Sequence, residues 1–180
     1  QERLENKTLK EIMNFEKVEK GEVFYMPAGR VHALGPGILL AEIQQTSDVT
    51  YRIYDWDRID RAGMTRELHT DLALDAIDFN VYDDYRTHYE DKLNETSTLV
   101  ESPYFITNQI HLDKPIRKDY TELDSFVIYI CIEGEASLKT EPMTVKLKMG
   151  EAVLLPARTG NVEIYPTQET RILEVYMILK

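Results

Sequence analysis

The chain has 180 residues, of which 43% are apolar, so it is long enough to bury one or two hydrophobic cores. Its formal net charge of −11 and its lack of a basic run exclude nucleic acid as an expected partner, because phosphate binding requires clustered Lys and Arg. No apolar run approaches the roughly 20 residues that cross a bilayer, and the start lacks a secretory signal, so we expect no membrane partner and a cytoplasmic location.

The first predicted elements are one helix, three strands and a second helix. Glu2–Phe15 is charged, with apolar residues near helical spacing, and predicts a short helix. Gly and Pro turn signals then separate three strand-like runs, at Val23–Met26, Ile38–Ile43 and Tyr51–Tyr54. Glu67–Phe79 carries an apolar stripe and indicates a helical connector.

The rest of the chain reads as a series of short strands. Such a series at about 8–12-residue spacing is typical of a sandwich or jelly-roll barrel. Cys131 is the only cysteine, which excludes an internal disulfide and a Cys-based zinc cluster, and its apolar surroundings predict a buried, inert thiol. The predicted strands are Tyr104–Leu112, Phe126–Ile132, Ala136–Thr140, Met143–Leu147, Ala152–Leu155, Val162–Tyr165 and Ile172–Ile178.

An internal repeat connects the two ends of the chain. Residues 20–29 align without a gap with residues 149–158, and each copy has a Gly turn, a Glu, an apolar strand and then Pro-Ala. This is the form of the second cupin sequence motif, so we predict an all-β fold of cupin-type jelly-roll barrels with small connecting helices. Val23–Met26 and Ala152–Leu155 should then be equivalent strands of two barrels.

The repeat also singles out one candidate metal ligand. The fifth residue after the proline is His32 in the first copy and Asn161 in the second. An imidazole at this position suits Zn²⁺ or a similar divalent ion, although a lone histidine at a strand edge can equally be a hydrogen-bonded structural residue. The second barrel is expected to hold no metal, and its interior should contain apolar side chains such as Phe126, Ile128, Val153 and Leu155.

A second candidate site pairs a carboxylate with a guanidinium. If the chain reverses as a hairpin about Ser47, Glu42 and Arg52 lie opposite each other, five residues from its centre. The pair can be an ordinary cross-strand salt bridge. Alternatively, Glu42 performs acid/base chemistry and Arg52 binds an oxyanion or a phosphate.

These segments closely resemble the type I phosphomannose isomerases, particularly their shorter bacterial branch. The similarity lies in Gly21–Gly35 and Glu42–Arg52, is specific over about residues 18–80 and continues through the C-terminal barrel. It implies that His32 is the last zinc ligand, that Glu42 lies in the active-site cavity and that Arg52 is the catalytic arginine. It also implies a sugar-phosphate substrate, because these enzymes interconvert mannose 6-phosphate and fructose 6-phosphate.

The resemblance predicts three parts: the C-terminal part of a catalytic cupin barrel at 1–62, a helical connector at 63–96 and a degenerate cupin-like barrel at 97–180. The earlier zinc ligands of the family have no counterpart here, so we expect an incomplete fragment that isomerises mannose 6-phosphate very poorly or not at all by itself. The alternative is a non-catalytic cupin-like binding module. The other histidines, His69, His88 and His111, should be structural or solvated. Gln44, Gln45, Asp55, Trp56 and Asp57 either line the cavity or serve as turn and packing residues.

Overall fold

The computed structural model describes residues 2–6, 8–47 and 49–177. The chain divides into two compact units, Gln1–Tyr85 and Arg86–Lys180, and each is described by itself. The three-part division expected from the sequence stays a prediction.

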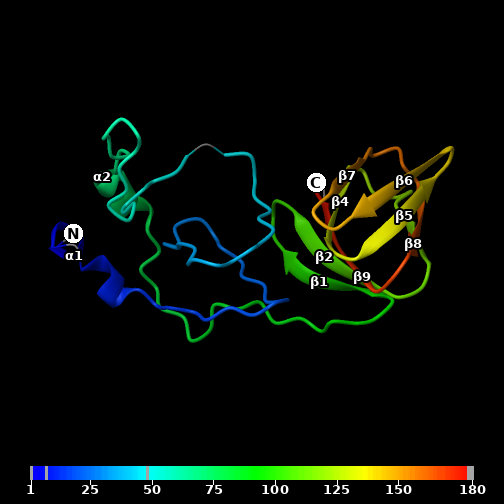
Figure 1. Ribbon diagram of the computed structural model, residues 1–180, viewed down its shortest axis with the longest axis horizontal. Helices are drawn as coiled ribbons and strands as arrows, with labels where there is room; N and C mark the ends of the chain where they lie inside the picture. The colour runs from blue at the N-terminus through cyan, green and yellow to red at the C-terminus, as the bar shows by residue number, and fades with distance from the viewer. Residues whose placement is uncertain (1, 7, 48, 178–180) are drawn as a thin grey trace. The chain divides into compact units, whose positions relative to one another are not determined.

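The second unit is a β-structure of two antiparallel sheets (Figure 1). One sheet has five strands in the order β1-β2-β9-β4-β7, and the other has four in the order β3-β8-β5-β6. The predicted all-β architecture of antiparallel strands is therefore confirmed for this unit. The strands are β1 (Glu95–Glu101), β2 (Ile106–Leu112), β3 (Ile116–Asp119), β4 (Val127–Glu133), β5 (Glu135–Thr140), β6 (Met143–Lys148), β7 (Ala152–Leu155), β8 (Asn161–Pro166) and β9 (Thr170–Tyr176).

All seven strands predicted in this unit are present, with ends that agree with the prediction to within two residues; the predicted end of the last strand, Ile178, lies outside the described residues. The two strands that we did not predict are β1 and β3. Their sequences, ETSTLVE and IRKD, are polar or charged and lack an apolar run. They are strands because each pairs antiparallel with a neighbour, β1 with β2 and β3 with β8.

The core of the second unit lies between the inner faces of the two sheets. Successive side chains of a strand alternate between faces, and in β4 the buried residues are Val127, Tyr129 and Cys131. The prediction that Phe126 and Ile128 fill the interior is therefore wrong, because register rather than hydrophobicity decides which face a strand residue occupies. The prediction is confirmed for the other two residues: Leu155 lies in the core and Val153 packs against it.

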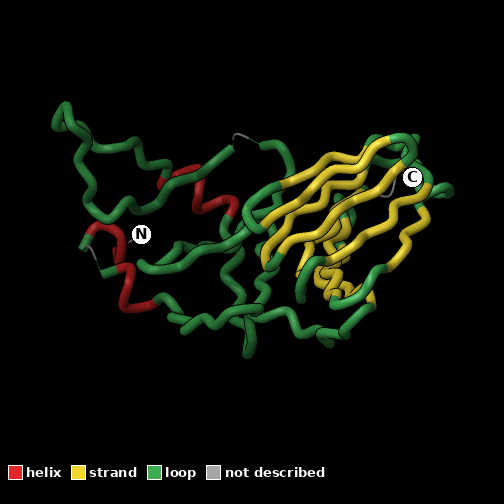
Figure 2. The backbone as a smooth tube through the Cα atoms, turned by 45° about the vertical axis from the view of Figure 1, so that its right-hand side comes forward, coloured by secondary structure: helices red, strands yellow, loops and turns green. Residues whose placement is uncertain are grey.

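The first unit contains short helices and irregular segments (Figure 2). Its helices are α1 (Glu2–Glu5), the 3-10 turn η1 (Leu9–Ile12) and α2 (Thr70–Ala76). The predicted helix over Glu2–Phe15 is thus two separate turns, because isolated short helices are marginal without a packed apolar face and Phe15 is 74% exposed. None of the helices in the described ranges is long and apolar enough to cross a bilayer.

The three strands predicted in the first unit are not formed. Among the described residues of 8–85 no segment is a β-strand, and Val23–Met26 is therefore not the structural equivalent of β7. A strand is stabilised by its ladder partners, and apolar propensity alone does not supply them. The side chains of Ile38, Leu39 and Leu40 are accordingly 40%, 90% and 43% exposed.

The repeat is nevertheless preserved as a turn. Gly21 and Gly150 both have left-handed backbones, with φ of 92° and 85°. In each copy the following glutamate closes the turn: Glu22 Oε2 accepts the Glu19 N–H at 2.8 Å, and Glu151 Oε2 accepts the Lys148 N–H at 2.9 Å. Gly is needed for the positive φ and Glu for the free N–H, which explains why this pair occurs in both copies.

Candidate functional site

His32 lies on an exposed irregular segment of the first unit. Its Nδ1 is 3.0 Å from the Arg30 carbonyl oxygen. A carbonyl can only accept, so Nδ1 carries the proton and the lone pair of a neutral ring is on Nε2. This is the tautomer that a metal-binding histidine adopts when a backbone carbonyl orients it.

Arg52 is held by the segment that leads into α2. Its backbone N–H donates to His69 Nδ1 at 3.1 Å, and its carbonyl accepts the His69 N–H at 2.7 Å. One guanidinium nitrogen, Nη1, donates to the Glu67 carbonyl at 3.3 Å. His69 is therefore a structural partner of Arg52. Within the described residues the half-buried guanidinium donates only to the Glu67 carbonyl, so its other N–H groups can contact an anion.

Glu42 lies on an exposed loop, and the hairpin that would bring it opposite Arg52 is not formed. No strand pairing joins their segments in the described part of the chain, and no ion pair between the two side chains occurs there. The expected juxtaposition of Glu42 and Arg52 is thus not present in this structure. Gln44 and Gln45 are also exposed.

The turn after Arg52 is built around an ion pair. Arg66 Nε donates to Asp55 Oδ2 at 2.7 Å, and Arg66 Nη2 donates to Asp55 Oδ1, so the contact is bidentate. These hydrogen bonds from Arg66 hold the pKa of Asp55 below its ordinary value. Trp56 and Asp57 follow with φ of 57° and 51°, a conformation that non-glycine residues rarely adopt. Asp55 therefore serves the turn.

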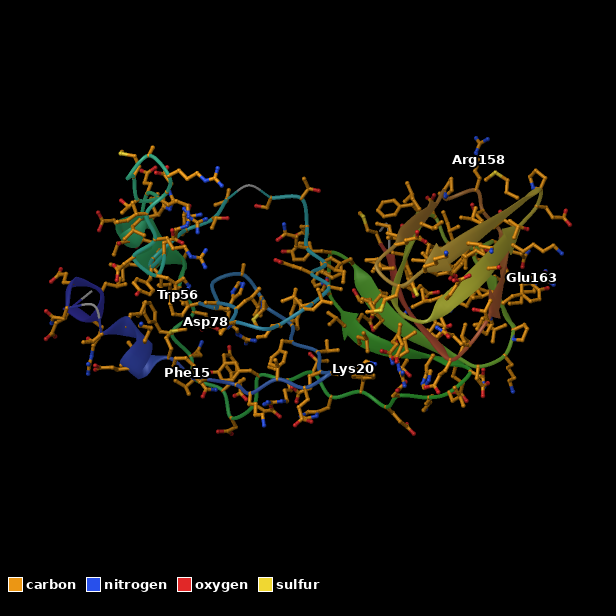
Figure 3. All side chains as sticks on the ribbon, viewed as in Figure 1. Phe15, Lys20, Trp56, Asp78, Arg158 and Glu163 are labelled. Carbon is orange, nitrogen blue, oxygen red and sulfur yellow. The ribbon has the colours of Figure 1, made fainter. Side chains whose placement is uncertain are left out.

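A cavity of about 380 Å³ lies beside this turn in the first unit. Lys10 Nζ stands 5.7 Å from the Tyr54 ring centroid and 5.4 Å from that of Trp56, which is labelled in Figure 3. His32, Glu42 and Arg52 do not line the cavity, so the predicted site residues lie outside it. Its lining is Leu4, Glu5, Leu9, Lys10, Ile53, Tyr54, Asp57, Leu68, Thr70 and Asp71.

The described residues provide one fitting zinc donor, His32. Across 2–6, 8–47 and 49–177 no group of three or more His, Cys, Asp or Glu side chains is arranged to hold a metal ion. Because a catalytic zinc site uses about three protein ligands, the donor chemistry of His32 fits a single ligand of such a site. At the position that corresponds to His32 in the sequence repeat, Asn161 Oδ1 accepts a hydrogen bond from Arg117 Nε at 3.0 Å.

The interior of the second unit contains a buried charge that sequence reasoning missed. Glu174 is 1% exposed, and its carboxylate forms an ion pair with Lys118, whose Nζ lies 2.9 Å from Oε1. The carboxylate also accepts hydrogen bonds from Asn108 Nδ2 at 2.7 Å and from the Tyr120 hydroxyl. The Tyr120 hydroxyl also contacts that of Tyr129. Burial raises the pKa of both tyrosines, and the nearby Glu174 carboxylate adds to this. The ion pair joins the two sheets, because Lys118 lies in β3 and Glu174 in β9.

His111 is also structural, as expected. Its Nδ1 is 2.9 Å from Asp91 Oδ1 and its Nε2 is 2.8 Å from Glu169 Oε1. Arg171 lies beside it and contacts the same two carboxylates, each at 3.3 Å. Both ring nitrogens of His111 are thus engaged by carboxylates, and neither is free to bind a metal.

Comparison with protein families and curated proteins relates the chain to one group of enzymes. Residues 95–176 match the family described as mannose-6-phosphate isomerase, cupin domain. The chain is 34% identical over 156 residues to mannose-6-phosphate isomerase ManA of Bacillus subtilis, an alignment that covers 86% of this chain and 49% of that protein. It is 31% identical over 140 residues to the mannose-6-phosphate isomerase of Streptococcus mutans, covering 77% and 44%.

Solved structures agree with this relationship. The crystal structure of the mannose 6-phosphate isomerase from Bacillus subtilis superposes with a TM-score of 0.60 at 33% identity, over 71% of this chain and 40% of that one. The chain therefore spans about half the length of the curated relatives it matches. Because the alignment with ManA covers 86% of this chain, the aligned span includes the positions of His32, Glu42 and Arg52.

Proposed function

We propose that the protein containing this chain interconverts mannose 6-phosphate and fructose 6-phosphate. Residues 95–176 match the mannose-6-phosphate isomerase cupin domain family, and the chain is related to these isomerases over most of its length. The observation that carries the proposal is the 34% identity over 86% of the chain to ManA, which is named as such an enzyme. Zinc dependence and the residue roles below are part of the same proposal.

The reaction moves hydrogen between neighbouring carbons of the sugar. From the aldose, a proton leaves C2, a proton is delivered to C1, O2 loses a proton and O1 gains one, so no oxidant or reductant is consumed. The enediol-like intermediate carries negative charge on its oxygens. A protein catalyst must therefore supply a proton acceptor beside C2 and positive groups beside O1 and O2.

Arg52 is assigned to the charge that develops on the sugar oxygens. A guanidinium carries a positive charge, and its planar fork can contact two oxygens at once. The two backbone hydrogen bonds between Arg52 and His69, at 3.1 and 2.7 Å, restrain the residue before substrate binds. Such preorganisation is what makes a fixed positive group effective in a transition state.

Glu42 and His32 are assigned to proton transfer and metal binding. The exposed Glu42 carboxylate is free to accept a proton from the sugar or from a bound water. His32 presents Nε2 with its lone pair, because Nδ1–H is donated to the Arg30 carbonyl at 3.0 Å. Zinc, when bound there together with further ligands, would polarise sugar oxygens as a Lewis acid.

The test is a coupled assay of mannose 6-phosphate isomerisation by the full-length gene product, whose intact mass is checked against its open reading frame. Arg52→Ala should lower kcat/KM by roughly 100-fold or more, as expected when a transition-state donor is removed. Arg61→Ala removes an exposed charge from a neighbouring loop and should leave turnover unchanged. Full activity of Arg52→Ala would refute the role of the arginine, and an inactive full-length protein that retains zinc would favour the alternative of a binding module.

A further inference from the structure

We propose that Arg30 is a positioning residue for His32, clamped by the aromatic rings of Tyr82 and Tyr85 that follow α2; this inference rests on the proposed function. The Arg30 guanidinium carbon lies 4.8 Å from the centroid of the Tyr82 ring and 5.3 Å from that of Tyr85. The Arg30 carbonyl, in turn, accepts the hydrogen bond from His32 Nδ1. The clamp and the candidate ligand are thus joined through one residue.

The backbone on both sides of that carbonyl is also fixed. Arg30 N donates to the Pro27 carbonyl at 3.2 Å, which closes a turn, and Arg30 Nη1 donates to the Tyr25 carbonyl at 2.9 Å. Gly29, with φ of 87°, occupies the position of the turn that requires a left-handed residue. The side chain of Arg30 therefore locks the same turn whose carbonyl orients His32.

The clamp is attached to the end of α2. The Gly29 carbonyl accepts the Asp78 N–H at 2.9 Å, and a Cβ at Gly29 would lie 2.5 Å from the Ala76 carbonyl oxygen. Asp78, labelled in Figure 3, accepts the Tyr82 hydroxyl at 2.8 Å and so orients that ring toward Arg30. The rings of Tyr82 and Tyr85 meet edge to face, with centroids 5.9 Å apart.

The segment of residues 67–85 therefore positions two residues of the proposed site, Arg52 and His32. Its start fixes Arg52 through His69, and its end fixes His32 through the Arg30 clamp. Groups that orient a metal-binding histidine typically change metal affinity by 10- to 100-fold when they are removed. We therefore expect the Arg30 clamp to affect the metal affinity of the site as well as the stability of the fold.

The experiment measures Co²⁺ binding by visible absorption, and Zn²⁺ binding by competition, in the full-length protein. Arg30→Met should weaken metal affinity by about 10-fold, and Arg30→Lys, which keeps a cation over the rings, should weaken it less. Tyr82→Leu opens the clamp from the other side and should reproduce the loss. Arg61→Met is the matched control for a removed charge, and urea unfolding checks that each variant is folded.

Each outcome decides between the two proposals. Weaker binding in Arg30→Met and Tyr82→Leu, with Arg61→Met unchanged, supports the clamp. Unchanged affinity in both clamp variants, while His32→Ala loses affinity, overturns the clamp and leaves the proposed function standing. If His32→Ala itself binds metal normally, then the role of His32, and the clamp with it, is wrong.

Discussion

Gly134 is the position where a single methyl group should damage the second unit most. It forms the turn between β4 and β5 with φ of 78°, a left-handed conformation. A Cβ built there would lie 2.5 Å from the Glu169 carbonyl oxygen and 2.6 Å from Thr170 Oγ1. Both distances are below any real carbon–oxygen contact, so Gly134→Ala must shift the start of β9.

The cost can be estimated from the contacts that would break. The left-handed backbone costs an alanine about 1 kcal/mol. Thr170 Oγ1 accepts the Glu135 N–H at 3.2 Å, and its single proton can be donated to the Gln168 carbonyl at 2.8 Å or the Glu135 carbonyl at 3.0 Å. Losing two such hydrogen bonds in a buried site costs about 1 kcal/mol each. We therefore expect Gly134→Ala to lower the free energy of unfolding by about 3 kcal/mol or more.

Gly150→Ala is the matched control. Its φ is 85°, but a Cβ there would have no atom within 4 Å. It should therefore cost only the backbone term of about 1 kcal/mol. Urea unfolding of the chain followed by far-UV circular dichroism measures both losses. Equal destabilisation by the two substitutions would refute the steric reasoning and leave backbone strain as the whole effect.

Three further predictions concern ionisable groups. Lys118→Met leaves the Glu174 carboxylate, which is 1% exposed, without its ion-pair partner and should lower the free energy of unfolding in urea by roughly 3–5 kcal/mol. Adding Glu174→Leu should restore much of that stability. A single Lys118→Met variant with unchanged stability would contradict this. Because Arg66 lowers the folded pKa of Asp55, their contact stabilises above the ordinary pKa near 4 and is lost as pH falls through the lower folded value. Arg66→Met should thus reduce the fall in the free energy of unfolding between pH 6 and pH 3. If the pH dependence of this variant is unchanged, the Asp55–Arg66 pair does not cause the fall. Burial raises the pKa of the Cys131 thiol, and the residue is 1% exposed. Alkylation of Cys131 should therefore be slow in the native protein and fast in urea. Rapid alkylation of the native protein would disprove the burial of the thiol.

Local pattern was sufficient for most strands of the second unit. Met143–Lys148 alternates apolar and polar residues, Ala152–Leu155 is a short apolar run, and both are strands bounded by turn residues. The same reasoning failed for Ile38–Ile43, which has the composition of a strand but no partner in the described structure. Backbone hydrogen bonding between segments, and not composition, makes a run of residues a strand.

The candidate site was predictable only in part. The repeat and the resemblance identified His32, Glu42 and Arg52 as residue types suited to metal binding, proton transfer and charge stabilisation. The hairpin that was to join Glu42 and Arg52 is not formed, and His69 holds Arg52 instead. A partner 17 residues away cannot be read from periodicity, because periodicity reports only which face of one element a residue occupies.

The sequence by itself determined the features that depend on neighbouring residues: the strand–turn series of the second unit, the Gly-Glu turns at Gly21 and Gly150, and the single buried thiol of Cys131. Only the tertiary structure decided which β4 residues face inward, because that follows from cross-strand register. It also decided that Glu174 could be buried, since Asn108 pairs with it from 66 residues away. A charge enters a core only where such distant partners replace its hydration, and their meeting is a property of the fold.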